Sequence, residues 1–330
     1  MAKALITGAG GFIGSHVVET FLAEGYEVRA LVRYTSTGRR GHLDRSPAAL
    51  QAEKEGRLEI VLGDVTDPHL IDSILDGQDI VAHLAALIGI PYSYVAPASY
   101  QAVNVGGALH ILEAARRHGT KRVIIASTSE VYGTAQYTPI DESHPLQAQS
   151  PYSASKIAAD KLAESYHRSF GLPVVILRPF NTYGPRQSQR AIVPTVLVQA
   201  LSGAPHVYVG NLAPKRDLTF VQDTAKAFAL AAKAEGIEGQ TIHFGSGVAF
   251  TVEEIARKCL AAANSTASLI EDPQRVRPEK SEVGCLVCDP ANARSRLGWR
   301  AEIDLDQGIE KTAQYIRAFL DDYRSGIYAL

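Results

Sequence analysis

The chain has 330 residues, enough to bury a large core, and 46% of them are hydrophobic, which is ordinary for a globular protein. Its formal net charge is −2 and it has no basic block, which argues against nucleic acid as the main partner. No apolar run reaches the roughly 18 residues that span a bilayer, and a strand starts almost at Met1, which leaves no room for a signal peptide. We therefore expect a cytoplasmic globular protein without a membrane partner.

The three cysteines are too few for a disulfide framework in a chain of this length. Cys285 and Cys288 have a redox-like or zinc-like spacing, but they lie in an apolar, strand-like run without a second pair of ligands. We expect buried structural thiols and no metal site.

The first motif is a strand at 4–7, a glycine-rich turn and a helix. Gly8 and Gly11 let the backbone approach a pyrophosphate, and Gly14 lets the helix pack closely on the strand. The helix amino terminus then faces the phosphates with its partial positive charge. This order of elements predicts dinucleotide binding. The expected phosphate-binding residues are Gly8, Gly11, Phe12, Ile13 and Gly14.

The second predicted strand, 27–32, is followed by Arg33. NAD sites usually have an acid there for the ribose hydroxyls, whereas an arginine suits a ribose 2′-phosphate. Alternatively, Arg33 stacks on adenine or faces solvent. We expect NAD or NADP and leave the choice open.

Further strands are expected at 58–62, 79–83 and 174–178. Small residues after the second of these would let a cofactor lie against the backbone. An unusual loop spans 87–94, and a helix is expected from about 97 to 118.

The stretch from 127 to 156 carries the chemistry. The apolar run 122–126 predicts a buried parallel strand, so Glu130 and the hydroxyls before it lie at the carboxyl end, where open α/β sheets bind ligands. Tyr152 and Lys156 are four residues apart at the start of a helix and project from one face. A neighbouring ammonium favours the phenolate and lowers the tyrosine pKa from about 10. We interpret the pair as a proton-transfer device.

The chain resembles the extended short-chain dehydrogenase/reductase family over essentially its whole length. Three motifs carry this resemblance: the phosphate turn, the strand that ends in Ser-Thr-Ser-Glu, and Tyr-x-x-x-Lys. The resemblance implies an α/β fold, a doubly wound parallel Rossmann sheet with a smaller C-terminal α/β substrate lobe. It assigns 1–180 plus about 217–246 to dinucleotide binding, and 181–216 plus about 247–330 to the nucleotide sugar.

The same resemblance implies a homodimer that pairs through helices at 98–118 and 151–170, as a four-helix bundle. The tail from Asp304 to Leu330 is expected to form an amphipathic helix that closes the smaller lobe.

The resemblance also implies roles for individual residues. The catalytic residues would be Thr128, Ser129, Glu130, Tyr152 and Lys156. Besides the glycine turn, the cofactor would contact Arg33, Asp64, Val65, Leu84, Ala85, Ala86, Asn104, Tyr152 and Lys156. The nucleotide sugar would contact Tyr92, Asn181, Arg186, Val193, Arg216 and Arg277. Arginines suit its diphosphate, because guanidinium forks match phosphate oxygens.

In the implied reaction, a hydride leaves C4 of the sugar while Tyr152 removes the hydroxyl proton and Thr128 hydrogen-bonds the same oxygen. A 4-epimerase turns the keto sugar over and needs no carboxylate at position 130. A 4,6-dehydratase needs a base for the C5 proton and an acid for the departing C6 hydroxyl, and Glu130 fits that need. Hydride return to C6 then gives a 4-keto-6-deoxy sugar and regenerates the tightly bound cofactor.

Ser129 departs from dTDP-glucose 4,6-dehydratases, which have an acidic Asp at that position, whereas GDP-mannose 4,6-dehydratases carry Ser-Glu. The segments 87–94, 129–136 and 150–156 are most similar to the 4,6-dehydratases of nucleotide-linked N-acetylglucosamine in legionaminic-acid-type pathways. We therefore expect a lyase of that type. Which of Ser129 and Glu130 protonates the leaving hydroxyl, and which nucleotide base is bound, stay open.

Five alternatives remain. A related branch forms 5,6-ene sugars by returning the hydride to C4. A 4-epimerase is the second. A UDP-glucuronate decarboxylase shares Ser-Thr-Ser-Glu-Val-Tyr-Gly but differs around the catalytic tyrosine. A non-enzymatic cofactor-binding regulator is opposed by intact Thr128, Tyr152 and Lys156. A structural, reductase-like subunit that works only in a complex would be opposed by tight NAD(P) retention by the purified chain alone.

Overall fold

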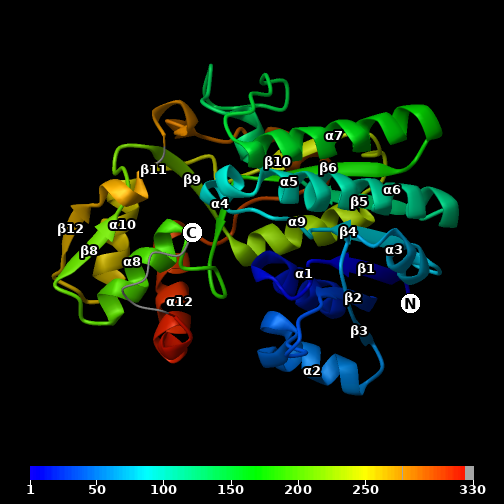
Figure 1. The fold of residues 1–330 in the computed structure, drawn as a ribbon, viewed down its shortest axis with the longest axis horizontal. Coiled ribbons are helices and arrows are strands. Elements are labelled where there is room, and N and C mark those ends of the chain that lie inside the picture. Colours follow the sequence, from blue (N-terminus) through cyan, green and yellow to red (C-terminus); the bar gives the residue numbers. More distant parts are fainter. Residues whose placement is uncertain (277, 324–330) are drawn as a thin grey trace.

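The computed structural model describes residues 1–276 and 278–323, which form a larger and a smaller lobe (Figure 1). The larger lobe contains a seven-stranded, wholly parallel sheet in the order β10-β6-β5-β4-β1-β2-β3. Its strands are β1 (Lys3–Thr7), β2 (Glu27–Arg33), β3 (Leu58–Gly63), β4 (Ile80–His83), β5 (Arg122–Ala126), β6 (Val174–Pro179) and β10 (Thr241–Phe244). The predicted Rossmann-type α/β fold is confirmed.

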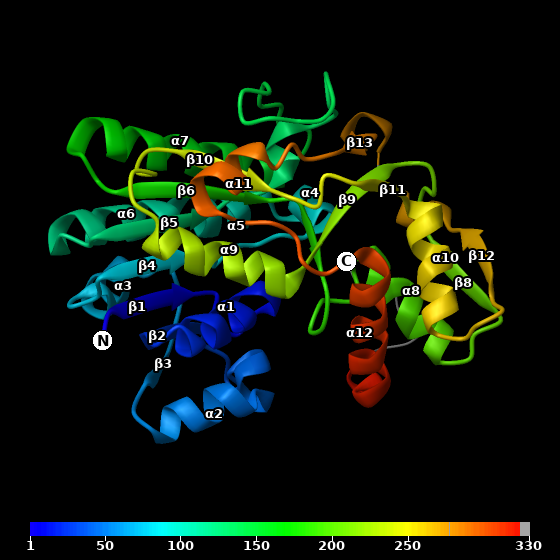
Figure 2. The ribbon, with the colours of Figure 1, turned by 180° about the vertical axis from the view of Figure 1, so that it is seen from behind.

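Helices cover both faces of this sheet (Figures 1 and 2). Side chains alternate along a strand, so Ala4 and Ile6 enter one core while Leu5 enters the other. The first core is closed by α1 (Phe12–Ala23), α2 (Pro47–Lys54), α9 (Val221–Lys233) and α11 (Ala291–Leu297). The second is closed by α3 (Pro68–Leu75), α6 (Gly107–His118) and α7 (Pro151–Phe170).

The strand order places the ligand crevice. β1 lies between β2 and β4, so the chain winds to one side of β1 first and to the other side afterwards. Open α/β sheets bind ligands outside the carboxyl ends of the strands at such a reversal. The glycine turn after β1 and the small residues after β4 meet there.

Two local predictions between β4 and β5 need correction. The expected loop at 87–94 contains a short helix, α4 (Ile90–Val95), which begins with Pro91 in its first turn, a position that suits proline because the missing N–H has no partner there anyway. The expected helix from 97 to 118 is continuous but irregular, with α5 (Pro97–Tyr100), a π-helical turn (Gln101–Gly106) and then α6.

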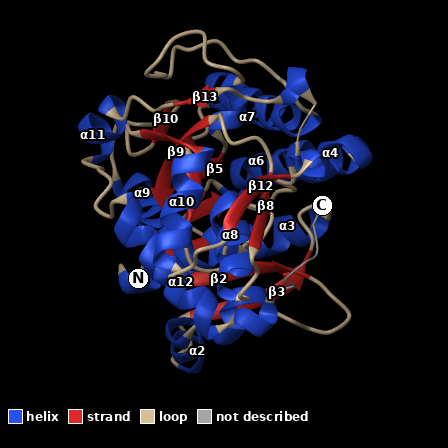
Figure 3. Ribbon diagram, turned by 90° about the vertical axis from the view of Figure 1, so that its left-hand side faces the viewer, coloured by secondary structure: helices blue, strands red, loops and turns tan. Residues whose placement is uncertain are grey.

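The smaller lobe packs three helices around two small sheets (Figure 3). One sheet contains β7 (Asn181–Tyr183), β9 (Lys215–Phe220), β11 (Ala249–Thr251) and β13 (Cys285–Leu286), and the other β8 (His206–Val209) and β12 (Ser268–Glu271). The helices are α8 (Ile192–Leu201), α10 (Val252–Ala262) and α12 (Leu305–Ala318). The expected boundary between 216 and 217 falls inside β9.

The end of the chain differs from the prediction of one long helix. α12 ends at Ala318, and a 3₁₀ turn (Leu320–Asp322) follows it. Residues 324–330, which the prediction also included, lie outside the described part. Further 3₁₀ turns are Gly41–Arg45, Ser129–Tyr132, Pro273–Arg275 and Glu279–Ser281.

Of the two neighbouring cysteines, Cys288 is buried as expected, whereas Cys285 on β13 is only partly buried. Within the described ranges, no group of three or more His, Cys, Asp and Glu side chains is arranged to hold a metal ion. In the same part of the chain, none of the helices has the length and apolar character that crossing a bilayer requires.

The close approach of the first turn to α1 predicts a stability effect. A Cβ on Gly14 would lie 2.1 Å from the carbonyl oxygen of Gly8, so Gly14→Ala forces the turn and the helix apart. We expect a loss of about 1–3 kcal/mol in unfolding free energy, measured by denaturant titration. Gly106→Ala is the matched control, because its nearest atom would be 3.9 Å away and alanine favours a helix by up to about 1 kcal/mol. Equal stability of the two variants would contradict the prediction.

Candidate functional site

A cleft of about 930 Å³ runs between the two lobes along the carboxyl ends of the parallel strands. It is lined by the turn after β1, the ends of β2 to β5, the start of α7 and the segments that lead into the smaller lobe. A volume of this size accommodates a large ligand.

The glycine turn forms the floor of the cleft. A Cβ on Gly8 would lie 2.8 Å from the backbone nitrogen of Ala85, and Gly8 has a positive φ of 68°. The turn therefore excludes side chains and brings bare backbone to the surface at the amino terminus of α1, as pyrophosphate binding requires. All five predicted phosphate-binding residues line the cleft, Gly8, Gly11, Phe12, Ile13 and Gly14.

The outer end of the cleft collects polar groups from β2 and β3. Arg33 and Arg39 line it, and in the described ranges neither takes part in a hydrogen bond or an ion pair, whereas Arg40 is held by Asp44 and Glu53. Asp64 and Val65 also line this end as expected, and Asp64 accepts hydrogen bonds from the backbone and hydroxyl of Thr66. Arg33 and Arg39 can therefore serve an anionic group.

The turn after β4 is held by hydrogen bonds to Thr7 at the end of β1. The hydroxyl of Thr7 accepts hydrogen bonds from the backbone nitrogens of Leu84 and Ala85, at 3.2 and 3.1 Å. It also pairs with Nδ1 of His83, at 2.8 Å. The predicted cofactor residues Leu84, Ala85 and Ala86 all line the cleft.

Asn104, also predicted to bind the cofactor, lies behind the residues after β4 that line the cleft. Its side chain is 1% exposed, hydrogen-bonds both backbone groups of Leu87 and donates to the hydroxyl of Ser155, at 2.9 Å. Asn104 therefore supports the loop after β4 and ties it to α7, and it does not line the cleft.

The predicted catalytic hydroxyls and carboxylate lie where β5 ends. Thr128 caps the 3₁₀ turn, because its hydroxyl accepts a hydrogen bond from the backbone nitrogen of Glu130 at 3.2 Å. Thr128, Ser129 and Glu130 all line the cleft. Among the described residues, no side chain forms a hydrogen bond or an ion pair with the Glu130 carboxylate, so Glu130 is not part of a structural salt bridge there.

α7 begins sharply, and this places the tyrosine. Ser150 and Ser153 form a reciprocal capping box, and Pro151 occupies the first turn, a combination that fixes a helix start. Tyr152 therefore enters the cleft from the first turn, 7% exposed. Lys156 follows one turn later, 4% exposed, and its Nζ donates to the carbonyl oxygen of Ala126 at 2.5 Å.

The expected lowering of the Tyr152 pKa is not found. Burial raises the pKa of the phenol well above its usual value, and the nearby Glu130 carboxylate adds to this, while a hydrogen bond with Thr128 lowers it. Burial also lowers the pKa of Lys156. The prediction counted the ammonium but not the desolvation of both groups, and desolvation is the larger effect.

The other predicted substrate residues divide into three groups. Asn181, Val193 and Arg216 line the cleft, and the side-chain nitrogen of Asn181 is buried without a hydrogen-bond partner within the described part. Tyr92 and Arg186 are not part of its lining. Arg277 lies outside the described residues.

Arg186 faces the larger lobe. Its guanidinium donates to Glu19 at 2.6 Å and to Ser15 at 3.1 Å, both on α1, so it joins the two lobes, and its predicted substrate contact stays a prediction. The sequence motif identified Arg186 but did not show that its backbone has a positive φ of 73°. Nor did it show that the side chain points toward α1.

Some cleft residues were not singled out from the sequence. Arg39, Arg190 and Arg275 supply guanidinium groups, and Glu282 pairs with Arg216 at 3.0 Å. Only Arg275, two residues before the predicted Arg277, had a neighbouring signal. The others come from loops, where no periodicity marks direction.

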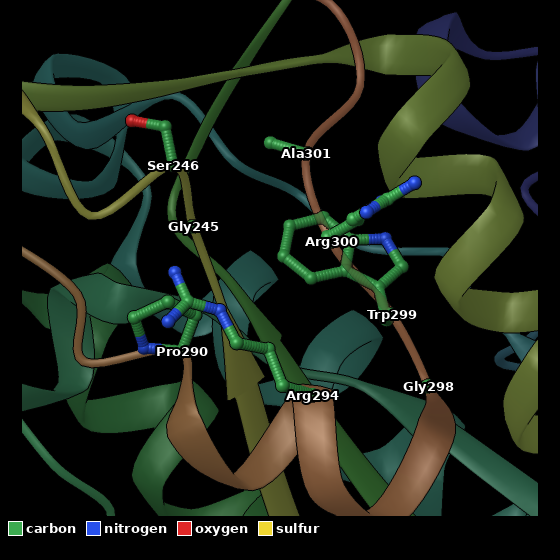
Figure 4. Close-up of a pocket in the computed structure, with 8 residues that line it drawn as sticks. All are labelled: Gly245, Ser246, Pro290, Arg294, Gly298, Trp299, Arg300 and Ala301. Atoms are coloured by element: carbon green, nitrogen blue, oxygen red, sulfur yellow. The ribbon is translucent and has the colours of Figure 1, made fainter.

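A second, smaller cavity of about 470 Å³ lies outside the cleft (Figure 4). It is lined by the turn after β10 and by residues at both ends of α11, including Arg294, Trp299 and Arg300. Trp299 is 1% exposed and donates its ring N–H to the backbone of Asp223, so it is a core residue. None of the catalytic candidates reaches this cavity.

The cleft can therefore move protons over a bound dinucleotide. A hydroxyl and a phenol in contact, Thr128 and Tyr152, lie beside the Glu130 carboxylate, which has no side-chain partner in the described part of the chain, and beside a buried ammonium, Lys156. The bare glycine turn fits a pyrophosphate.

Comparison with known proteins agrees with this geometry. A family model described as GDP-mannose 4,6 dehydratase matches residues 5–312. The dTDP-glucose 4,6-dehydratase of Actinoplanes sp. is 33% identical over 317 residues, which cover 96% of this chain and 98% of that protein. The UDP-glucose 4-epimerase of Mycolicibacterium smegmatis is 31% identical, with 96% and 98% covered.

Among solved structures, the dTDP-glucose 4,6-dehydratase of Streptomyces venezuelae, with NAD bound, superposes with a TM-score of 0.84 at 30% identity, covering 96% of this chain and 97% of that one. The chain belongs to the GDP-mannose 4,6-dehydratase family, within the extended short-chain dehydrogenases/reductases, as its motifs predicted.

Proposed function

We propose that the protein is a nucleotide-sugar 4,6-dehydratase whose substrate is a nucleotide-linked N-acetylglucosamine. The observation that carries the dehydratase assignment is the carboxylate of Glu130 in the cleft, next to Thr128 and Tyr152 and without a side-chain partner among the residues that the structure describes. A 4-epimerase has no use for a base at this place, whereas water elimination across C5 and C6 requires one.

The residues that would hold the cofactor are the glycine turn, Arg33, Asp64 with Val65, and the turn after β4. When bound there, NAD(P) would supply the redox chemistry, as a reversible acceptor for the hydride at C4 of the sugar. The arrangement of the phosphate turn, at a helix amino terminus, suits the cofactor pyrophosphate.

The protein side chains then handle the protons. Tyr152 takes the proton of the sugar C4 hydroxyl, and Thr128 hydrogen-bonds the same oxygen. Lys156 offsets the charge on the phenolate. Glu130 removes the proton from C5 and passes it to the leaving C6 hydroxyl, which departs as water. When the hydride returns to C6, C5 takes up one proton, which balances the proton that Tyr152 took from the C4 hydroxyl. Ser129 is 2% exposed and is a hydroxyl rather than a carboxylic acid, so we assign both transfers to the one carboxylate.

The substrate diphosphate would lie toward the smaller lobe. Asn181 offers a buried donor that has no hydrogen-bond partner within residues 1–276 and 278–323, and Arg216 offers a guanidinium. The N-acetylglucosamine assignment is supported by the similarity of segments 87–94, 129–136 and 150–156 to enzymes that act on that sugar. The expected division of the chain into a dinucleotide domain and a nucleotide-sugar lobe stays a prediction, as does the cytoplasmic location.

A second candidate, a 4-epimerase, is favoured by the epimerases among the relatives. It would use Tyr152 and Thr128 in the same way, and it would leave Glu130 without a chemical role.

Product analysis separates the two candidates. The purified protein is incubated with UDP-N-acetylglucosamine and, separately, with the GDP sugar, and the product is examined by mass spectrometry and proton NMR. We expect the loss of one water and a new methyl signal at C6. The same mass loss with an exocyclic alkene signal would indicate the 5,6-ene branch, and an unchanged mass with a new stereochemistry would indicate the epimerase.

Glu130→Gln tests the role of the carboxylate. Because the amide keeps the shape but cannot take a proton, we expect product formation to fall at least about 100-fold with cofactor binding unchanged. Tyr152→Phe is the comparison, and it should also remove the initial oxidation at C4, which is followed as cofactor reduction in a single turnover. Full activity of Glu130→Gln would rule out the dehydratase mechanism.

Arg33 tests the choice of cofactor. It lines the adenosine end without an acidic partner among the described residues, and a guanidinium there stabilises a 2′-phosphate. We expect Arg33→Ala to weaken NADP binding about tenfold and NAD binding by less than about twofold, measured by fluorescence titration. An equal loss for both cofactors would show that Arg33 contacts the adenine or the shared phosphates instead.

We also propose the homodimer through helices 98–118 and 151–170. Both helices cover the outer side of the sheet, and Leu109 and Phe170 on them are 37% and 55% exposed. Light scattering should give twice the mass of one chain for the wild type, and Leu109→Glu should shift the protein toward the monomer. An unchanged mass of the variant would place the contact elsewhere.

A further inference from the structure

Helix α7 presents a third ionisable group in line with the catalytic pair. Tyr152, Lys156 and Asp160 follow one another at intervals of four residues, so they lie on one face of the helix. Asp160 is 1% exposed. The chemistry proposed above uses the first two groups and leaves the buried carboxylate without a role.

The carboxylate of Asp160 is held on one side only. Its Oδ2 accepts hydrogen bonds from the hydroxyl of Ser127 at 2.8 Å and from Nε of Arg178 at 3.0 Å, and Nη2 of Arg178 lies 2.9 Å away. Its Oδ1 is buried and has no hydrogen-bond partner within the described part of the chain. A buried oxygen left unpaired is costly and calls for an explanation.

Arg178 fixes this geometry. It lies at the end of β6, 4% exposed, and also donates to the hydroxyl of Tyr132 at 3.1 Å. Ser127 is the first residue after β5, and its backbone nitrogen donates to Leu177 at 2.7 Å. The carboxylate is therefore anchored to two neighbouring strands, directly behind the catalytic residues.

Lys156 is buried, and a buried ammonium is stable only with a negative charge nearby. Its ammonium donates to a neutral carbonyl, that of Ala126. Burial lowers the pKa of Lys156, and Asp160 raises it again. His83 on β4 is kept uncharged at neutral pH, because burial and Lys156 lower its pKa to about 3.

The remaining ionisable groups around the pair are Glu130 from the 3₁₀ turn, Tyr100 from α5, and Tyr132 and Arg178 beneath. The charge of Glu130 acts on Tyr152, and Arg178 adds a second positive charge close by. Among the described residues, Asp160 is thus the group that supports the charged form of Lys156.

We propose that Asp160 is a positioning residue: fastened by Arg178 and Ser127, its carboxylate keeps Lys156 an ammonium at the end of β5, from where it acts on Tyr152. The inference rests on the proposed role of the tyrosine and lysine in proton transfer, and it holds for a dehydratase and for an epimerase alike.

The test follows the lysine directly, in the full-length protein. The ε-carbon of lysine is labelled with ¹³C, the Lys156 resonance is assigned with Lys156→Met, and its chemical shift is titrated with pH. In Asp160→Asn we expect the titration midpoint of Lys156 to move to lower pH by about 1 or more. We expect kcat at neutral pH to fall about tenfold, with KM nearly unchanged.

Glu164→Gln is the matched control, because it removes one negative charge from the same helix one turn further on. Glu164 is partly exposed and pairs with Lys161 and Arg168, so the Lys156 titration and kcat should stay as in the wild type. Because the titration needs no substrate, it remains informative if the protein does not dehydrate sugars.

Asp160→Asn leaves Arg178 buried without its partner and could fail to fold. The double variant Asp160→Asn/Arg178→Gln removes both charges, and we expect its Lys156 midpoint to lie below the wild type but above the single variant. A Lys156 midpoint equal to that of the wild type in either folded variant would overturn the proposal.

Discussion

The site depends on one hydrogen bond between the helix that carries the catalytic residues and the strand that ends beneath them. Lys156 donates from α7 to the carbonyl of Ala126, the last residue of β5. This contact joins the helix that carries Tyr152 to the strand that leads into Thr128. The capping box at Ser150 fixes where the helix starts, so both ends of the arrangement are determined by local backbone chemistry.

The sequence predicts this half of the molecule well, because its signals are periodic or steric. Buried parallel strands read as continuous apolar runs, and a turn in which Gly14 packs against Gly8 tolerates no side chain. The four-residue interval between Tyr152 and Lys156 translates directly into a shared helix face. Strand positions, the phosphate turn and the catalytic cluster follow from these rules.

The smaller lobe and the electrostatics follow less well, and for physical reasons. A motif identifies Arg186 but does not show where its side chain points, because that depends on Glu19 in another element, α1. Tyr92 and Asn104 show the same limit, since the one belongs to the short helix α4 and the other to the wall behind the cleft. The pKa of Tyr152 depends on how completely the fold excludes water, which spacing alone does not reveal.

Some charged side chains in the cleft are paired with an opposite charge and others are not, and this affects how substrate binding and proton transfer can occur. Arg216, on the substrate side, is already neutralised by Glu282, so a diphosphate that binds there must compete with a carboxylate. Glu130 has no such partner in the described ranges, and Tyr152 stays protonated because burial disfavours its anion. This arrangement keeps the phenol neutral and leaves the Glu130 carboxylate accessible from the cleft. In the mechanism that we propose, proton removal by Tyr152 therefore depends on positive charge near the phenol, which Lys156 supplies only as long as it remains an ammonium.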